Sequence, residues 1–149
     1  MSKVALRRGR WSLSHHAYFV TANTAGRVRL FVDFETARLV IAEMRRIHEH
    51  RQVDSLAWVL MPDHVHWLFV LREDAGLATV MKNFKARSAV AVNRRTGRFG
   101  EVWQRGYYDH AIRGDEEMQN VARYIVANPL RANLVDRLGS YPHWDAVWL

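Results

Sequence analysis

The stretch SLAWVLMPDHVHWLFVL, residues 55–71, decides the fold. It consists of two apolar runs, 55–61 and 64–71, separated by the pair Pro62-Asp63. Proline presets its own backbone angle and aspartate caps the backbone locally, so this pair predicts a turn. Both runs are rich in residues that favour strands. The stretch therefore predicts a β-hairpin.

Strand and helix patterns alternate on both sides of this hairpin. Residues 17–22 are rich in aromatic and β-favouring residues and predict a first strand. Residues 34–50 and 76–95 repeat apolar side chains at three- and four-residue spacing, which predicts two helices. Residues 102–112, an aromatic segment after two glycines, predict a fourth strand.

A last helix is predicted over residues 115–128. Acidic residues in its first turn complement the helix dipole, and Pro129 is expected to mark its end. The order of elements predicts an α+β protein: a ferredoxin-like βαββαβ antiparallel sheet with helices on one face, plus a C-terminal helix. We expect one domain over residues 1–149, with a basic N-terminal arm (1–16) and an irregular C-terminal tail (131–149).

The amino-acid composition limits the classes of partner and of metal ligand that the protein can use. Of 149 residues, 22 are Lys or Arg and 15 are Asp or Glu, so the net charge of +7 favours a polyanion such as nucleic acid. The alternative is a basic protein whose charge only keeps it dispersed. Cysteine is absent, so any metal must be held by histidine, carboxylate or amide groups. No apolar run resembles a signal sequence or a membrane span, and we expect a cytoplasmic protein.

His64 and His66 are the first candidates for chemistry. Side chains alternate across a strand, so these two imidazoles share one face, about 6 to 7 Å apart, while Val65 points into the other layer. This arrangement suits two ligands of one metal ion. The alternative is a pair of polar residues that hydrogen-bond to water, because two ligands alone do not complete a site.

The last helix carries the second candidates. Asn120, Tyr124 and Asn128 follow one another at four-residue spacing, beside the apolar stripe of that helix. If the helix packs against the sheet face that carries the histidines, a phenol and an amide oxygen meet the imidazole pair. A phenol is a weak nucleophile unless something assists it, and a metal can do so. Taken alone, both residues suit ordinary structural positions at the edge of the core.

Basic and aromatic residues are interleaved in several places. Cations follow phosphates while flat rings stack on unpaired bases, which is how proteins hold single strands. The candidate DNA-binding residues are Arg7, Arg8, Arg10, Lys82, Lys85 and Arg105. The alternative is a solvated basic surface over core aromatics, and we expect several of the six tryptophans in the core.

Three motifs in this order carry a resemblance: MPDHVH at 61–66, VWQRGYYDHAIR at 102–113 and YIVANP at 124–129. With the tail YPHW at 141–144, the chain resembles the REP-associated tyrosine transposases. These are relatives of the small single-tyrosine HUH transposases of bacterial insertion sequences. The similarity runs from about residue 17 to this tail.

The resemblance implies a site and a reaction. His64 and His66 match the metal ligands of the family, Tyr124 matches its nucleophile, and Asn128 matches a third, polar ligand. The metal is Mg²⁺ or Mn²⁺. The tyrosine attacks a DNA phosphate, which gives a 5′-phosphotyrosine link and a free 3′-hydroxyl that can reverse the reaction or join a new end. Insertion-sequence relatives carry glutamine at the position of Asn128, whereas the REP-associated branch carries asparagine.

The same resemblance implies partners. The expected substrate is single-stranded or hairpin DNA of repetitive extragenic palindromes, bound partly by an N-terminal arm that contains Arg7, Arg8 and Arg10. Insertion-sequence relatives form homodimers, while the REP-associated branch favours a monomer, which we expect here.

Two other functions fit the same residues. One is a non-catalytic, single-stranded nucleic-acid-binding module with a ferredoxin-like sheet. The other is a metal-dependent hydrolase in which the histidine pair activates water and Tyr124 only positions substrate. Tyr107 and Tyr108 are reserve nucleophiles, of which only one can face the site if both lie on a strand.

Overall fold

The computed structural model describes residues 16–72 and 75–147 of the chain. Its centre is a five-stranded sheet in which all neighbouring strands are antiparallel. From one edge to the other the strands are β4 (Tyr108–Ala111), β1 (Ala17–Asn23), β3 (His64–Leu71), β2 (Val53–Met61) and β5 (Trp144–Ala146). The predicted hairpin is therefore confirmed as β2 and β3, and the predicted α+β class is also confirmed.

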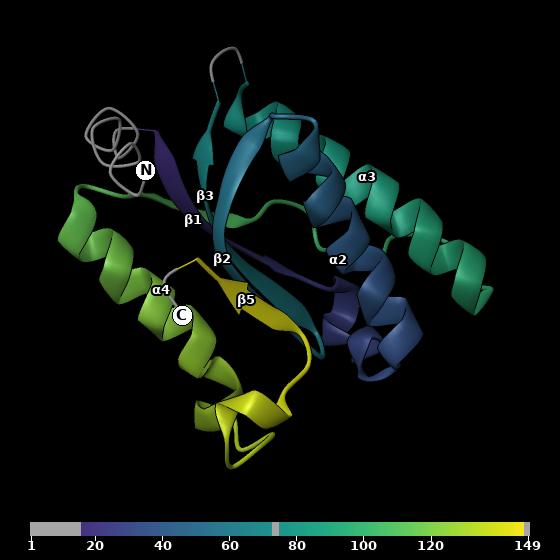
Figure 1. Ribbon diagram of the computed structural model, residues 1–149. Coiled ribbons are helices and arrows are strands. Elements are labelled where there is room, and N and C mark those ends of the chain that lie inside the picture. The colour runs from purple at the N-terminus through teal and green to yellow at the C-terminus, as the bar shows by residue number, and fades with distance from the viewer. Residues whose placement is uncertain (1–15, 73–74, 148–149) are drawn as a thin grey trace.

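The two faces of the sheet carry different helices (Figure 1). Helices α2 (Phe34–Glu49) and α3 (Leu77–Thr96) pack together on one face, as the ferredoxin-like pattern predicts. Helix α4 (Asp115–Arg131) packs on the opposite face, mainly against β2. Short 3₁₀ turns complete the described chain: η1 (Ala25–Arg27), η2 (Leu30–Val32) and η3 (Leu138–Ser140).

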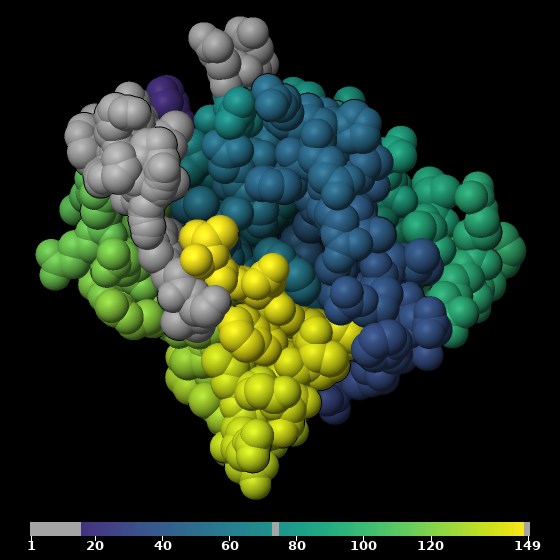
Figure 2. Space-filling model, viewed as in Figure 1, coloured from purple at the N-terminus to yellow at the C-terminus, as the bar shows by residue number. Residues whose placement is uncertain are grey.

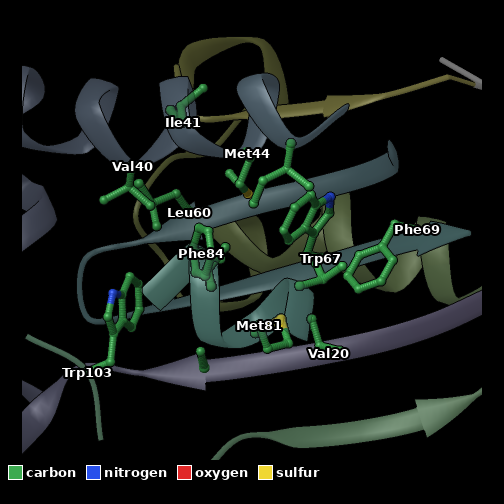
Figure 3. Close-up of a cluster of buried hydrophobic side chains, with 14 of the residues drawn as sticks. Val20, Val40, Ile41, Met44, Leu60, Trp67, Phe69, Met81, Phe84 and Trp103 are labelled. Atoms are coloured by element: carbon green, nitrogen blue, oxygen red, sulfur yellow. The ribbon is translucent and has the colours of Figure 1, made fainter. Parts of the chain in front are cut away.

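The larger core lies between the sheet and the α2–α3 pair (Figure 3). Trp67 of β3 is fully buried there, and its indole nitrogen donates to the hydroxyl of Ser55 at 2.9 Å. Trp103 is also buried, and its indole nitrogen donates to Ser88 on α3 at 2.9 Å. Each indole N–H group thus has a hydrogen-bond acceptor, as is usual for buried tryptophans. The expectation that several tryptophans belong to the core is confirmed for these two.

The smaller core fixes α4 against the sheet. Leu68 and Val70 follow the histidines of β3 on the same face and pack in one cluster with Ala122 and Ile125 of α4. Because Tyr124 directly precedes Ile125, the packing of this stripe determines which part of the helix surface lies beside the histidines. No helix within residues 16–72 and 75–147 is both long and apolar enough to cross a membrane.

The fourth strand is shorter than the sequence predicts. Residues 102–107 cross the sheet edge as a loop with a single bridge between Thr24 and Trp103, and pairing with β1 begins only at Tyr108. Two local features interrupt the ladder. Trp103 turns into the α3 core, and Gly106 has a φ of 73°, a left-handed value that a regular strand does not contain.

The end of α4 and the tail also differ from prediction. Pro129 does not end the helix, which continues to Arg131. A proline in the last turn removes only one backbone hydrogen bond, and Pro129 is itself buried. The tail is not wholly irregular, because Trp144–Ala146 forms β5 beside β2.

Tyr141 joins the tail to the sheet. Its hydroxyl donates to the carbonyl of Leu60 at 2.5 Å, and burial raises the pKa of Tyr141 to about 12. We expect Tyr141→Phe to lower the free energy of unfolding by about 1 kcal/mol, because one part-buried hydrogen bond is lost with little change in shape. Urea denaturation at pH 7 measures this. Tyr107→Phe is the control, and an equal loss in both variants would contradict this role for Tyr141.

Candidate active site

His64 and His66 of β3 lie on the sheet face that α4 covers. Their ring centroids are 4.7 Å apart, with the rings nearly perpendicular. Val65 between them belongs to the α2–α3 core, so the alternation predicted from the sequence is confirmed. His66 is only 8% exposed, whereas His64 is half-buried at the start of the strand. The two imidazoles therefore form a pair with one buried and one accessible member.

Each imidazole is held through its Nδ1 atom. Nδ1 of His64 lies 2.8 Å from a carboxylate oxygen of Asp63, and Nδ1 of His66 lies 2.7 Å from the hydroxyl of Thr21. A carboxylate only accepts, so His64 donates from Nδ1 and retains a lone pair on Nε2. If His66 donates to Thr21 in the same way, both Nε2 atoms are available as ligands, and the Nδ1 contacts are the outer partners typical of metal-binding histidines.

The two imidazoles fit part of the coordination sphere of a metal ion, and other ligands would have to complete it. Among the described residues, no cluster of three or more His, Cys, Asp and Glu side chains is suited to hold an ion. The pair supplies two nitrogen ligands, and the remaining positions would fall to an amide, to water or to a substrate oxygen. Such a partly open set is typical of catalytic rather than structural metal sites.

Tyr124 of α4 lies beside the buried histidine. The centroid of its ring is 5.9 Å from that of His66 and 6.1 Å from that of Phe19 on β1, both in edge-on contact. The side chain is 48% exposed, so its position is fixed on one side while solvent reaches the other. A phenol and two imidazoles thus share one small region, as the sequence analysis expected from the packing of the last helix.

Arg131 is a member of this region that the sequence analysis missed. Its guanidinium carbon lies 4.1 Å from the centroid of the Tyr124 ring, and its Nη2 donates to the backbone carbonyl of Tyr124 at 2.8 Å. Arg131 follows Tyr124 by seven residues, about two helical turns, so both lie on one side of the helix. The sequence prediction ends the helix at Pro129 and therefore does not place Arg131 on it.

Asn128 is placed on the stripe of Tyr124, but its contact is with the helix. Its Nδ2 donates to the carbonyl of Tyr124 at 3.5 Å, a long bond, which leaves Oδ1 as the free acceptor of the amide. Asn128 therefore lies one turn from Tyr124, and within the described residues it forms no hydrogen bond with either imidazole.

The environment of His66 keeps its imidazole neutral. Burial lowers the pKa of His66 to about 3, and the nearby charges of His64 and Arg131 act in the same direction. A neutral imidazole is the form that binds a metal, so His66 stays a competent ligand well into the acidic range.

This pKa predicts a pH dependence of stability in metal-free protein. The unfolded state protonates His66 near its ordinary value of 6.5, while the folded state does so only near 3. Stability should therefore fall as the pH drops through this window, by up to about 1.4 kcal/mol per pH unit. Urea denaturation with a chelator measures it, and His66→Gln should flatten the slope. Equal slopes in both proteins would rule out this burial effect.

The two reserve tyrosines lie on opposite sides of the sheet. Tyr108 pairs with Thr21 and contacts Phe19 at 6.0 Å between ring centroids, so it lies on the face of the histidines. Tyr107 lies on the other side, where the ammonium of Lys85 is 5.5 Å from its ring. Only Tyr108 lies on the same sheet face as the histidines, and within the described residues its ring forms no aromatic pair with either of them.

The predicted DNA-binding residues fall into three groups. Arg7, Arg8 and Arg10 lie outside the described residues. Lys82 and Arg105 are exposed. Lys85 instead donates to the backbone carbonyls of Gln104, at 2.8 Å, and Gly106, and burial lowers its pKa. The ammonium of Lys85 is thus occupied in holding the loop before β4.

Comparison with known proteins identifies the family and agrees with the fold. The family model described as "Transposase IS200 like" matches residues 10–128, which include the histidine pair, Tyr124 and Asn128. The chain belongs to this family. The resemblance found in the sequence is thereby confirmed.

Individual relatives are more distant. The chain is 24% identical over 136 residues to the REP-associated tyrosine transposase of Escherichia coli (strain K12), covering 89% of this chain and 78% of the relative. A Haemophilus influenzae relative that carries the same class name is 28% identical over 105 residues, covering 64% of this chain and 60% of its own length. The structure of a REP-associated tyrosine transposase bound to a REP hairpin aligns with a TM-score of 0.73 at 21% identity, over 87% of this chain and 76% of that one.

Proposed function

We propose that this protein is a metal-dependent transposase or endonuclease of single-stranded DNA, which cuts and rejoins strands near palindromic hairpins with Tyr124 as nucleophile. The observation that carries the proposal is the approach of the Tyr124 ring to the His64–His66 pair, 5.9 Å from His66, from a different layer of the fold. Membership of the IS200-like transposase family supports it. The hairpin substrate is inferred from the REP-bound relative.

The reaction is an exchange of phosphodiester bonds. The Tyr124 oxygen attacks phosphorus, the bond from phosphorus to O3′ breaks, and the strand on the 3′ side stays on the protein through its 5′-phosphate. The phenol loses one proton and O3′ gains one, so no water is consumed. A free 3′-hydroxyl can attack the same phosphorus later, which restores or rejoins the DNA strand.

The residues of this chain supply position and charge. Thr21 and Asp63 orient the two imidazoles through Nδ1, while Phe19 and Arg131 bracket the phenol ring. Arg131 also places a positive charge where a DNA phosphate would approach, which favours the ionic transition state. His64, His66 and Asn128, through its Oδ1 atom, would hold Mg²⁺ or Mn²⁺ in this proposal. Such an ion, when bound, polarises the scissile phosphate.

The test is the identity of the product. Purified protein is incubated with a single-stranded hairpin oligonucleotide, labelled at either end, in Mg²⁺ or Mn²⁺. We expect a protein–DNA band that survives denaturant and carries the 3′-end label, together with a free 5′-labelled fragment that ends in a 3′-hydroxyl. Two free fragments would indicate a hydrolase. Binding without either product, across metals and sequences, would indicate a non-catalytic binding module.

The basic residues predict a matched pair of variants. Lys82 and Lys85 are three residues apart on α3, on the sheet face opposite to that of the histidines. Lys82→Gln should weaken DNA binding and lower the slope of log K against log salt by about 0.7, the value for one phosphate contact on a single strand. Lys85→Gln should leave that slope unchanged and reduce stability, because its ammonium bonds the chain itself. Salt titrations of binding measure both, and the reverse pattern would contradict this assignment.

A further inference from the structure

A hollow lies beside the Pro62–Asp63 turn. Its volume is about 280 Å³, near the lower limit for sites that hold a small molecule. Segments far apart in sequence form its wall: η2, the start of α2, the β2–β3 turn, and the tail. The lining residues that carry the argument are Arg29, Phe34, Pro62, Leu134, Tyr141 and His143. We call this hollow the aromatic pocket.

Aromatic rings in tilted and edge-on contact make up much of its wall. The ring centroid of Phe34 is 5.3 Å from that of His143, which in turn is 5.7 Å from that of Tyr141. Phe34 is 52% exposed although it is large and apolar, so its ring is available to an incoming planar group. His143 is buried, and its Nδ1 lacks a hydrogen-bond partner among the described residues. A buried polar atom without a partner is costly.

The entrance of the pocket is positively charged. Arg29 lines it, and the guanidinium of Arg38 lies 5.8 Å from the centroid of the Phe34 ring. Neither arginine forms an ion pair with an acidic side chain in the described part of the chain. Flat rings with free cations at the entrance match an unpaired base and its phosphate, whereas a purely apolar ligand would leave both charges unused.

Two residues that line the pocket are close in sequence to the candidate active site. Pro62 is two residues before His64, and Leu134 is three residues after Arg131. A second, more open hollow at the end of α4 shares Leu134 with the pocket. Figure 2 shows the tail, in yellow, lying between the end of α4 and the first turns of α2. The end of α4 thus links the segment that carries Tyr124 to the wall of the pocket.

We propose that the aromatic pocket binds one unpaired base of the DNA strand that is cut, with Phe34 stacking on the base and Arg29 contacting an adjacent phosphate. The inference rests on the proposed function, because it assumes that single-stranded DNA reaches Tyr124. A base held in the pocket lies at a fixed distance from Tyr124. The pocket would therefore help to determine which phosphate of the strand is attacked.

The test uses fluorescence of 2-aminopurine, which stacking quenches. The probe is placed at successive unpaired positions of a hairpin oligonucleotide and bound to Tyr124→Phe protein, which retains the surface but lacks the nucleophile. We expect strong quenching at one position only. Adding Phe34→Ala should abolish that quenching and weaken binding about tenfold or more, the usual effect of removing one base stack. Arg29→Gln should weaken binding and reduce its salt dependence.

Two matched variants control for general effects. Phe99→Ala removes a ring that is 94% exposed, and Arg45→Gln removes an exposed arginine of α2 that does not line the pocket. Both should leave quenching and affinity unchanged. Phe34→Leu retains apolar bulk without an aromatic ring, so it should keep the fold and still lose the quenching.

The two hypotheses fail in different ways. Wild-type protein that forms the covalent product, while Phe34→Ala and Phe34→Leu bind and quench as wild type does, would overturn the pocket and leave the proposed function intact. Wild-type protein that never forms the product would refute the proposed function. Quenching that is unaffected by the Phe34 variants and spread evenly over all positions would show that the pocket holds no base.

Discussion

Tyr124→Phe is expected to abolish the covalent protein–DNA product, by about a thousandfold or more, because the attacking oxygen is removed. DNA affinity should remain within about twofold, since the phenyl ring retains the packing against Phe19 and Arg131 and only a hydroxyl is lost. The measurement is the fraction of labelled oligonucleotide that remains on the protein in denaturant, with affinity measured separately on the same oligonucleotide.

Tyr108→Phe is the informative counterpart, because Tyr108 is the other exposed tyrosine on this face of the sheet. It should form the covalent product as wild type does. A product that persists in Tyr124→Phe and disappears in Tyr108→Phe would assign the nucleophile to β4. It would also require a different alignment of DNA over the histidines.

The second large effect is expected at the imidazole pair. His66→Gln removes the buried nitrogen that we propose as a metal ligand. It should slow cleavage about a hundredfold or more, because the charge that develops on the phosphate loses its stabilisation. Thr21→Val conserves shape but removes the partner of His66 Nδ1, and should weaken metal binding about 10- to 100-fold. Cleavage rates over a Mn²⁺ titration, with calorimetric binding of Mn²⁺ alone, measure both effects.

His110 offers a matched control for this experiment. It lies on the same sheet face but pairs with Glu117, with 2.8 Å between its Nε2 and the carboxylate. His110→Gln should leave Mn²⁺ affinity and cleavage unchanged. If His66→Gln binds Mn²⁺ as tightly as wild type and cuts at the same rate, the pair is not the metal site.

The hairpin and the shared face of the histidines could be predicted because they depend on local rules. Pro62-Asp63 specifies a turn, and alternation on a strand places His64 and His66 together whatever surrounds them. The position of Tyr124 was predicted from one assumption, that the apolar stripe beside it is buried on the sheet. The cluster that joins Ile125 to Leu68 confirms that assumption.

Other features depend on tertiary contacts that local patterns do not encode. Thr21 lies opposite His66 because of the register between β1 and β3, which the sequence does not specify. The short β4 reflects the burial of Trp103, and β5 exists because the tail returns to β2. The position of Arg131 does not follow from the local pattern, because Pro129 predicts the helix end two residues too early. The aromatic pocket is formed by segments more than 100 residues apart, from Arg29 to His143, and no single motif indicates it.

The central claim is that a phenol from α4 and two imidazoles from β3 act on one phosphate. The most direct measurement digests the covalent product with protease and nuclease and locates the nucleotide on the peptide by mass spectrometry. The account predicts a nucleotide linked through its 5′-phosphate to Tyr124, formed only when divalent metal is present and lost in His66→Gln. A link to any other residue, or a link to Tyr124 that forms equally well with chelator and without His66, would contradict it.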